Sequence, residues 1–189
     1  GGIGGTIHLL RHRVDLASTA NVDASGQSGG GEVLVGGDLH GANPGIRNAL
    51  STFVARGAQI YADAVAAGNG GKVVVWSNNN TQYLGNISTR GGDVSGNGGF
   101  VEVSGKDYLL FQGTADRLAP HGVAGTLLLD PTDLTITATG TTSVPCSGSA
   151  PETCDEGSVT TSTLTTGDLQ TALLSGSVIV DATTAGGTG

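Results

Sequence analysis

A short pattern, two glycines followed by alternating residues, recurs along this chain and restricts the folds open to it. After the glycines come an outward residue, an inward aliphatic residue, an outward residue and a second inward aliphatic residue, which is the alternation of a half-buried β-strand. The first inward positions are residues 7, 33, 73, 101 and 127, so successive copies lie 26, 40, 28 and 26 residues apart. Recurrence at this period indicates a repeat architecture, in which each repeat packs against the next.

Each period contains further strand-like pieces. Second apolar pieces carry Val14 and Leu16, Tyr83, Leu109 and Phe111, and Leu134 and Ile136. Third, shorter pieces span residues 21–24, 59–62 and 86–89 and end in turns. The connections lack the two-residue spacing of hairpins, and no helical pattern interrupts residues 1–140. We therefore predict an all-β chain that coils as a β-solenoid, with about three short parallel strands per rung of 26–28 residues.

The inward positions of the repeat are uniformly aliphatic. In a solenoid each of them would stack on its counterpart one strand spacing away, about 4.8 Å. Each buried side chain would then contribute about 1.5–3 kcal/mol to folding. In the same register Glu32 and Lys72 are expected to be neighbours on the outer surface. The two predicted columns are Ile7, Val33, Val73, Val101 and Leu127, and Leu9, Val35, Val75, Val103 and Leu129.

The chain divides into three stretches. Residues 1–140 hold the rungs, and the long 40-residue interval is explained by a loop insertion at residues 41–50. Residues 141–158 form a polar loop with a pair of cysteines, and residues 159–189 return to strand as a decorated continuation of the same fold. This last stretch includes one short helix, with Thr166 as its N-cap and Gly176 after its end. Because the chain starts in mid-repeat and ends in a turn, we expect it to be a piece of a longer protein.

Composition excludes several classes of partner. The 189 residues include 34 glycines, and 13% of them are charged, with a net charge of −8. Such an acidic balance disfavours nucleic acid and anionic membranes as partners. No stretch approaches the roughly 20 apolar residues of a membrane span. The glycines are expected to supply turns with positive φ.

Cys146 and Cys154 are the two cysteines, and both lie in the polar loop. An even number of cysteines in a chain of secreted type favours a disulfide between them, and two free thiols are the alternative. A metal site would need more ligands than this loop offers. We expect the bridge to close a small loop outside the stacked columns.

The remaining polar candidates have simpler explanations. His8, His12, His40 and His121 are scattered over different rungs and are interpreted as surface histidines. The acidic residues follow strands or flank glycines, which turn chemistry explains; a polysaccharide-cleaving site would need several of them stacked on adjacent rungs. We predict no catalytic residues, no metal site and no cofactor. The acidic residues considered are Asp38, Asp63, Asp93, Asp107 and Asp116.

Two short motifs and two aromatic residues have two interpretations each. Asn79 and Asn86 begin sequences that match the N-glycosylation sequon, although turn chemistry also explains asparagine at such positions. Trp76 and Phe100 occupy outward positions of the alternation. Each of them packs under a neighbouring loop or forms part of a binding surface, and we favour the loop.

Several stretches resemble a known family. These are GNGGKVVVWSNNNTQYLGNISTRGG (residues 68–92), GNGGFVEVSGKDYLLFQG (96–113), GTLLLDPTDLTIT (125–137) and TTGDLQTALLSGSVIVDAT (165–183). They are similar to the repeat region of large filamentous-haemagglutinin-like adhesins of bacteria. The resemblance implies a right-handed parallel β-helix without catalytic residues. It also implies export by two-partner secretion through an outer-membrane transporter.

The resemblance and the repeat lead to the same expected function. We expect a structural shaft segment of a secreted protein at the bacterial cell surface, which mediates attachment, aggregation or biofilm formation. Its receptor, whether protein or glycan, and lateral self-association between chains stay open. The alternative is a carbohydrate-binding or carbohydrate-cleaving β-helix protein, which clustered carboxylates on one face of adjacent rungs would distinguish.

Overall fold

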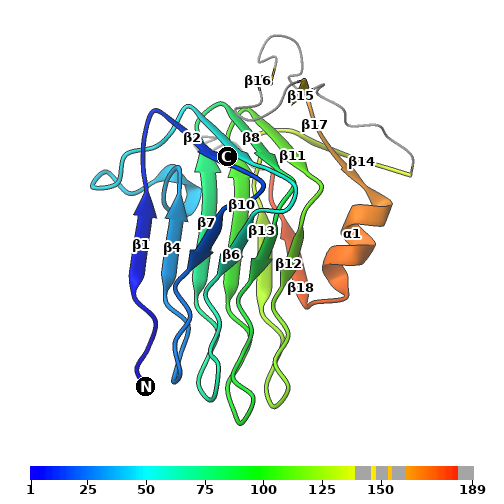
Figure 1. Ribbon diagram of the computed structural model, residues 1–189. Coiled ribbons are helices and arrows are strands. Elements are labelled where there is room, and N and C mark those ends of the chain that lie inside the picture. The colour runs from blue at the N-terminus through cyan, green and yellow to red at the C-terminus, as the bar shows by residue number, and fades with distance from the viewer. Residues whose placement is uncertain (139–145, 148–152, 155–160, 183–189) are drawn as a thin grey trace.

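The computed structural model describes residues 1–138, 146–147, 153–154 and 161–182. Most of its secondary structure is β-strand, arranged in three parallel sheets, with one α-helix. The chain passes through the three sheets in the same order several times (Figure 1). Within the described residues no helix has the length and the apolar character needed to cross a membrane.

The longest glycine-flanked strands form the first sheet, which we call sheet A. All of its neighbouring strands run parallel. Its strands, in spatial order, are β1 (Thr6–Leu9), β4 (Glu32–Val35), β7 (Lys72–Ser77), β10 (Phe100–Gly105), β13 (Thr126–Leu129) and β18 (Ser177–Val180).

Sheets B and C contain the second and third pieces of each period. Sheet B has the spatial order β2 (Arg13–Leu16), β5 (Ser51–Val54), β8 (Asn80–Tyr83), β11 (Tyr108–Phe111), β17 (Ser162–Thr165) and β14 (Leu134–Thr137). Sheet C has the order β3 (Asn21–Asp23), β6 (Gln59–Tyr61), β9 (Asn86–Ser88) and β12 (Thr114–Asp116). Outside these sheets lie a 3-10 turn η1 (Leu39–Gly41), a two-stranded antiparallel pair β15 (Cys146–Ser147) and β16 (Thr153–Cys154), and helix α1 (Thr166–Leu173).

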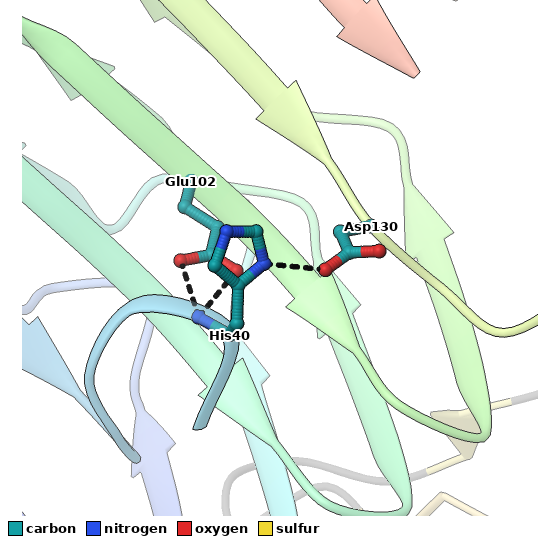
Figure 2. Close-up of side chains that lie close together, drawn as sticks. All are labelled: His40, Glu102 and Asp130. Atoms are coloured by element: carbon teal, nitrogen blue, oxygen red, sulfur yellow. Dashed lines mark hydrogen bonds and ion pairs between the residues drawn. The ribbon is translucent and has the colours of Figure 1, made fainter. Parts of the chain in front are cut away.

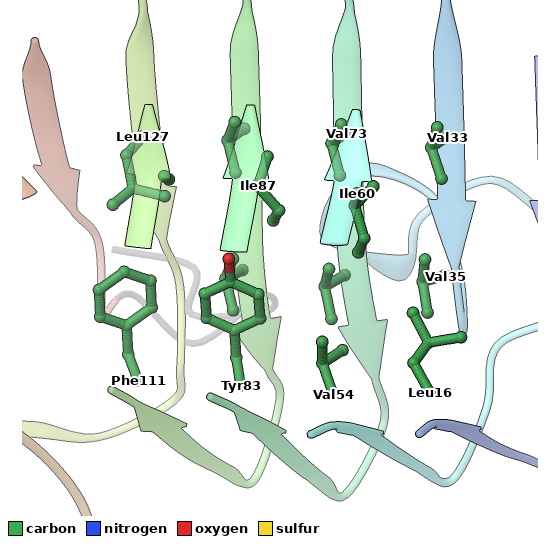
Figure 3. Packing of buried hydrophobic residues seen from close by; sticks show 14 of the residues in the cluster. Leu16, Val33, Val35, Val54, Ile60, Val73, Tyr83, Ile87, Phe111 and Leu127 are labelled. Atoms are coloured by element: carbon green, nitrogen blue, oxygen red, sulfur yellow. The ribbon is translucent and has the colours of Figure 1, made fainter. Parts of the chain in front are cut away.

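The predicted aliphatic columns exist in the predicted register. Val33 pairs with Val73, Val73 with Val101, and Val101 with Leu127 across neighbouring strands of sheet A. These four residues are fully buried. Figure 3 shows how side chains of sheet A meet those of the other two sheets in one continuous core.

The glycine pairs serve a purpose other than the one we expected. A Cβ added to Gly70 would lie 2.0 Å from the carbonyl oxygen of Thr89, and one added to Gly71 would lie 2.0 Å from that of Gly31. Neither Gly70 nor Gly71 has positive φ. Here the pair is needed because backbone segments of neighbouring passes approach each other closely, a space that no side chain tolerates. Positive φ is found at other glycines, such as Gly57 and Gly68.

The last pass through sheet B departs from the order of the earlier passes. Leu134 and Ile136 lie in strand β14, as the apolar piece predicted. However, β17 lies between β11 and β14, and Leu164 of β17 is buried, whereas Ile136 is 50% exposed. Residues 162–165 return to the sheet and pair with both β11 and β14, so Leu164 takes the inner position.

Helix α1 follows β17 and precedes β18, where earlier passes have a strand of sheet C. Its N-cap is Thr165, one residue before the predicted cap, and the Thr165 hydroxyl accepts a hydrogen bond from the Asp168 N–H at 3.0 Å. Near its other end the fully buried Arg117 guanidinium donates to the carbonyl oxygen of Ala172 at 2.9 Å. A cation near the C-terminus of a helix is favourable, so Arg117 holds α1 against the end of sheet C.

Candidate functional site

Residues 36–50 fold back over the outer face of sheet A. They connect β4 to β5, so the insertion begins five residues before the predicted start at Gly41. Trp76 is 4% exposed beneath them and packs with Leu34, Val74 and Ile46 in a small cluster separate from the main core. A Cβ at Gly41 would lie 2.5 Å from the Trp76 ring, so this part of the insertion touches the indole directly. The interpretation of Trp76 as packed under a loop is confirmed.

An ion-pair cluster fastens the start of the insertion to the sheet. Lys72 Nζ lies 2.7 Å from Asp38 Oδ1 and 3.0 Å from Glu32 Oε1, so the predicted Glu32–Lys72 pair is confirmed. Partial burial acts to raise the pKa of Asp38. Hydrogen bonds from Lys72, Asn43 and the Leu39 N–H outweigh it and lower that pKa from 3.8 to about 2. Asp38 is therefore more than the turn residue that the sequence indicated, although it does cap η1.

His40 carries the insertion further across the sheet. Its φ is 54°, in the left-handed region that residues with side chains rarely adopt, and its backbone N–H points toward Glu102 on β10. The N–H lies 3.2 Å from both carboxylate oxygens of Glu102. Its ring Nδ1 lies 2.6 Å from Asp130 Oδ2, just beyond the end of β13. Figure 2 shows the imidazole between the two carboxylates.

Glu102 is the least expected member of this group. It is fully buried and lies between two aliphatic neighbours on sheet A, Val74 on β7 and Leu128 on β13. Burial raises the pKa of Glu102 from 4.5 to about 7, against the opposing effects of the His40 N–H, the His40 charge and a hydrogen bond with Ser104. A buried carboxylate is costly unless it is neutralised or paired, so this position needs a specific partner.

The electrostatics of His40 depend on three carboxylates. Partial burial acts to lower the pKa of its imidazole, but the hydrogen bond with Asp130 and the charges of Glu102, Asp130 and Asp181 raise it above 6.5. Ser104 connects the acids, because its hydroxyl accepts the Asp130 N–H at 3.1 Å. One ligand atom from each of His40, Glu102 and Asp130 lies within 4.8 Å of the other two. An imidazole nitrogen and two carboxylates at this separation can share a proton or hold a cation.

The structure separates the other histidines from this group. His8, His12 and His121 are exposed, and none belongs to a cluster of metal-ligating side chains in the described part of the chain. The interpretation of His40 as a plain surface histidine is incomplete, because its exposed ring is tied to Asp130 and its backbone to a buried acid.

The remaining acidic candidates mostly have structural roles. Asp63 accepts hydrogen bonds from the Ser88 hydroxyl and the Arg90 N–H, both at 2.7 Å. Asp116 forms an ion pair with Arg90 at 2.7 Å. Asp93 and Asp107 are exposed.

Sequence reasoning missed Glu102 and Asp130. An outward glutamate in a strand is normally solvated, and nothing local indicates that it is covered. One signal was present: in the predicted register Glu102 lies between two apolar outward residues, Val74 and Leu128. The cover itself comes from residues 36–50, whose path the repeat pattern does not specify.

A second polar feature lies on sheet B. A groove of about 550 Å³ runs across the starts of the strands of sheet B. It is open to solvent and lined by charged, amide and aromatic side chains. Its walls include His12, Arg13, Asn79, Asp107, Tyr108 and Asp133.

The two asparagines of the sequons differ in exposure. Asn79 is exposed, whereas Asn86 is half-buried in β9 and accepts a hydrogen bond from the Thr114 hydroxyl at 2.8 Å.

The backbones of Cys146 and Cys154 lie opposite each other in the antiparallel β15–β16 pair. Their side chains lie outside the described residues, so the disulfide stays a prediction.

Comparison with known proteins adds no assignment. No family model matches this chain, and a search of the curated proteins finds no match.

Proposed function

We propose that this chain is a structural segment of a secreted bacterial surface adhesin, built as a right-handed parallel β-helix. The role would be mechanical: stacked rungs form a stiff rod that carries binding surfaces away from the cell and so serves attachment, aggregation or biofilm formation. Export through an outer-membrane two-partner secretion transporter is part of the same proposal, and it rests on the resemblance to filamentous-haemagglutinin-like repeats.

The observation that carries the proposal is the unbroken parallel pairing of sheet A. Six strands, from β1 to β18, pair in sequence order with their aliphatic residues in register. Sheets B and C repeat much of this order, so successive passes stack on one another. A right-handed course is the common one for parallel strands joined by crossovers. An architecture of this kind grows in length by adding passes, which suits a shaft.

Deletion of the segment tests the shaft role. In cells that display the adhesin containing this chain, removal of residues 70–97 should shorten the fibre by about one strand spacing, roughly 4.8 Å. Folding and export should survive because repeat stability is roughly a sum of neighbour terms. Electron microscopy of isolated fibres and surface labelling measure both. Loss of export, or an unchanged length, would contradict the role as a shaft.

The groove over sheet B favours the second candidate, a carbohydrate-binding β-helix protein. Exposed Asp107 and Asp133 line this groove together with Tyr108. The groove therefore offers hydrogen-bonding groups and an aromatic side chain to a sugar chain. Tyr108 is only 4% exposed, which limits stacking on a sugar ring.

A paired experiment separates the two candidates. The shaft proposal expects the purified chain to show no binding or hydrolysis of a polysaccharide panel. It also expects the double variant Asp107→Ala/Asp133→Ala to leave cell attachment unchanged. Binding of an oligosaccharide that this double variant abolishes, but that the variant Asp93→Ala outside the groove retains, would favour the carbohydrate-binding candidate.

A further inference from the structure

Two carboxyl groups with little exposure to solvent lie on either side of the His40 imidazole. Glu102 is fully buried, Asp130 has a side chain only 15% exposed, and the charge of Asp181 also acts on His40. On the neighbouring strand β7 the cation Lys72 is already paired with Glu32 and Asp38. His40 is therefore the cationic group that acts on Glu102, while the nearby Asp130 acts in the opposite sense.

The donor set selects one class of ligand. His40 offers an imidazole nitrogen, and Glu102 and Asp130 each offer a carboxylate oxygen, with these three atoms within 4.8 Å of one another. Zn²⁺ binds this mixture of nitrogen and oxygen, whereas Ca²⁺ and Mg²⁺ prefer oxygen ligands alone. Three protein ligands leave a fourth tetrahedral position for water.

We propose that His40, Glu102 and Asp130 bind a single Zn²⁺ ion, which fastens residues 36–50 to the outer face of sheet A. The ion takes the place of the proton now shared between His40 Nδ1 and Asp130 Oδ2, 2.6 Å apart. Ligands about 2.1 Å from zinc lie about 3.4 Å from one another, so this pair opens slightly while Glu102 draws in. Rotations of the two carboxylate side chains supply these movements.

The three ligands come from distant parts of the chain, and this gives the ion a mechanical role. His40 lies in the insertion, Glu102 on β10 and Asp130 after β13, so one ion would join the insertion to two neighbouring strands of sheet A. It also explains why a buried acid lies between the aliphatic residues Val74 and Leu128. The zinc site does not depend on whether the chain is an adhesin.

Titration with Zn²⁺ alone tests the proposal. The untagged chain, stripped with EDTA and alkylated so that cysteine thiols cannot bind metal, is titrated by calorimetry at pH 7.5. We expect one site per chain and an increase in melting temperature on binding. Glu102→Gln keeps the size of the side chain and should weaken binding at least about 10-fold. Asp130→Asn provides an independent test should Glu102→Gln fail to fold. His12→Asn removes an exposed histidine outside the cluster and should bind as the unmodified chain does.

Other outcomes overturn the proposal. Equal zinc affinity in Glu102→Gln and Asp130→Asn would place the metal elsewhere. Absence of a saturable site would leave a hydrogen-bonded cluster without metal. Equal binding of Ca²⁺ would contradict the choice of zinc. Co²⁺ adds a spectroscopic readout, because a tetrahedral site with one imidazole gives visible absorption that Asp130→Asn should abolish.

Discussion

His40 Nδ1 and Asp130 Oδ2 lie 2.6 Å apart although the two residues are 90 positions apart in the sequence. The contact exists because the parallel register of sheet A brings the end of β13 within two strands of β7, over which residues 36–50 fold. A surface insertion is thereby attached to the body of the sheet at its far side as well as at its base.

Val101→Asp should prevent folding. Val101 is fully buried between Val73 and Leu127. Burying an unpaired charge at this position would cost more free energy than the few kcal/mol that most substitutions cost. The matched control is Val123→Asp, because Val123 is 73% exposed. Circular dichroism and thermal unfolding of both variants decide the matter; a Val101→Asp protein as stable as the control would show that the register is wrong.

Trp76→Ala should release residues 36–50 from the sheet. The indole fills the space beneath the insertion, and its loss should cost about 3 kcal/mol. Limited digestion with trypsin measures the release through cleavage after the exposed Arg47. Trp76→Phe keeps much of the packing and should be cleaved more slowly; equal cleavage rates in the two variants would argue against this role of Trp76.

Glu102→Gln should stabilise the metal-free chain at alkaline pH. The pKa of Glu102 is raised from 4.5 to about 7, so its neutral form is favoured in the folded chain. The stabilising contribution of Glu102 protonation to the free energy of unfolding is fully present below pH 4.5 and is lost as the pH rises through 7. The loss is at most about 3 kcal/mol. Denaturant unfolding in EDTA should therefore show a gain for the variant at pH 8 and little change at pH 4.5. The same difference at both values would mean that ionisation of Glu102 is not the cause.

Cys146 and Cys154 should be oxidised to a disulfide in exported protein. Their backbones are paired directly across β15 and β16. An even number of cysteines in a secreted chain favours a disulfide between them. Mass measurement after alkylation, with and without reduction, detects the bridge. Replacement of both by serine should leave the melting temperature nearly unchanged, because the pair lies outside sheets A, B and C. Free thiols in freshly exported material would reject the bridge.

Periodicity alone determined the main core of this protein. The alternation after each glycine pair specifies which side chains face inward, and recurrence of the pattern aligns Val33, Val73, Val101 and Leu127 in one column. Both are local properties of the chain, since a strand has a side-chain period of two and a shift by one residue would expose the whole apolar set.

Tertiary structure decided what interrupts the repeat. Strand β17 takes the place next to β11 that β14 would otherwise occupy. The two strands have similar patterns, so only packing against β11 decides between them. The path of residues 36–50 is likewise not periodic. It alone determines that Trp76 and Glu102, both outward in the alternation, are buried. The candidate site was therefore hidden in the sequence: its three side chains have no common spacing, and the burial that gives Glu102 its unusual chemistry comes from a segment 62 residues away.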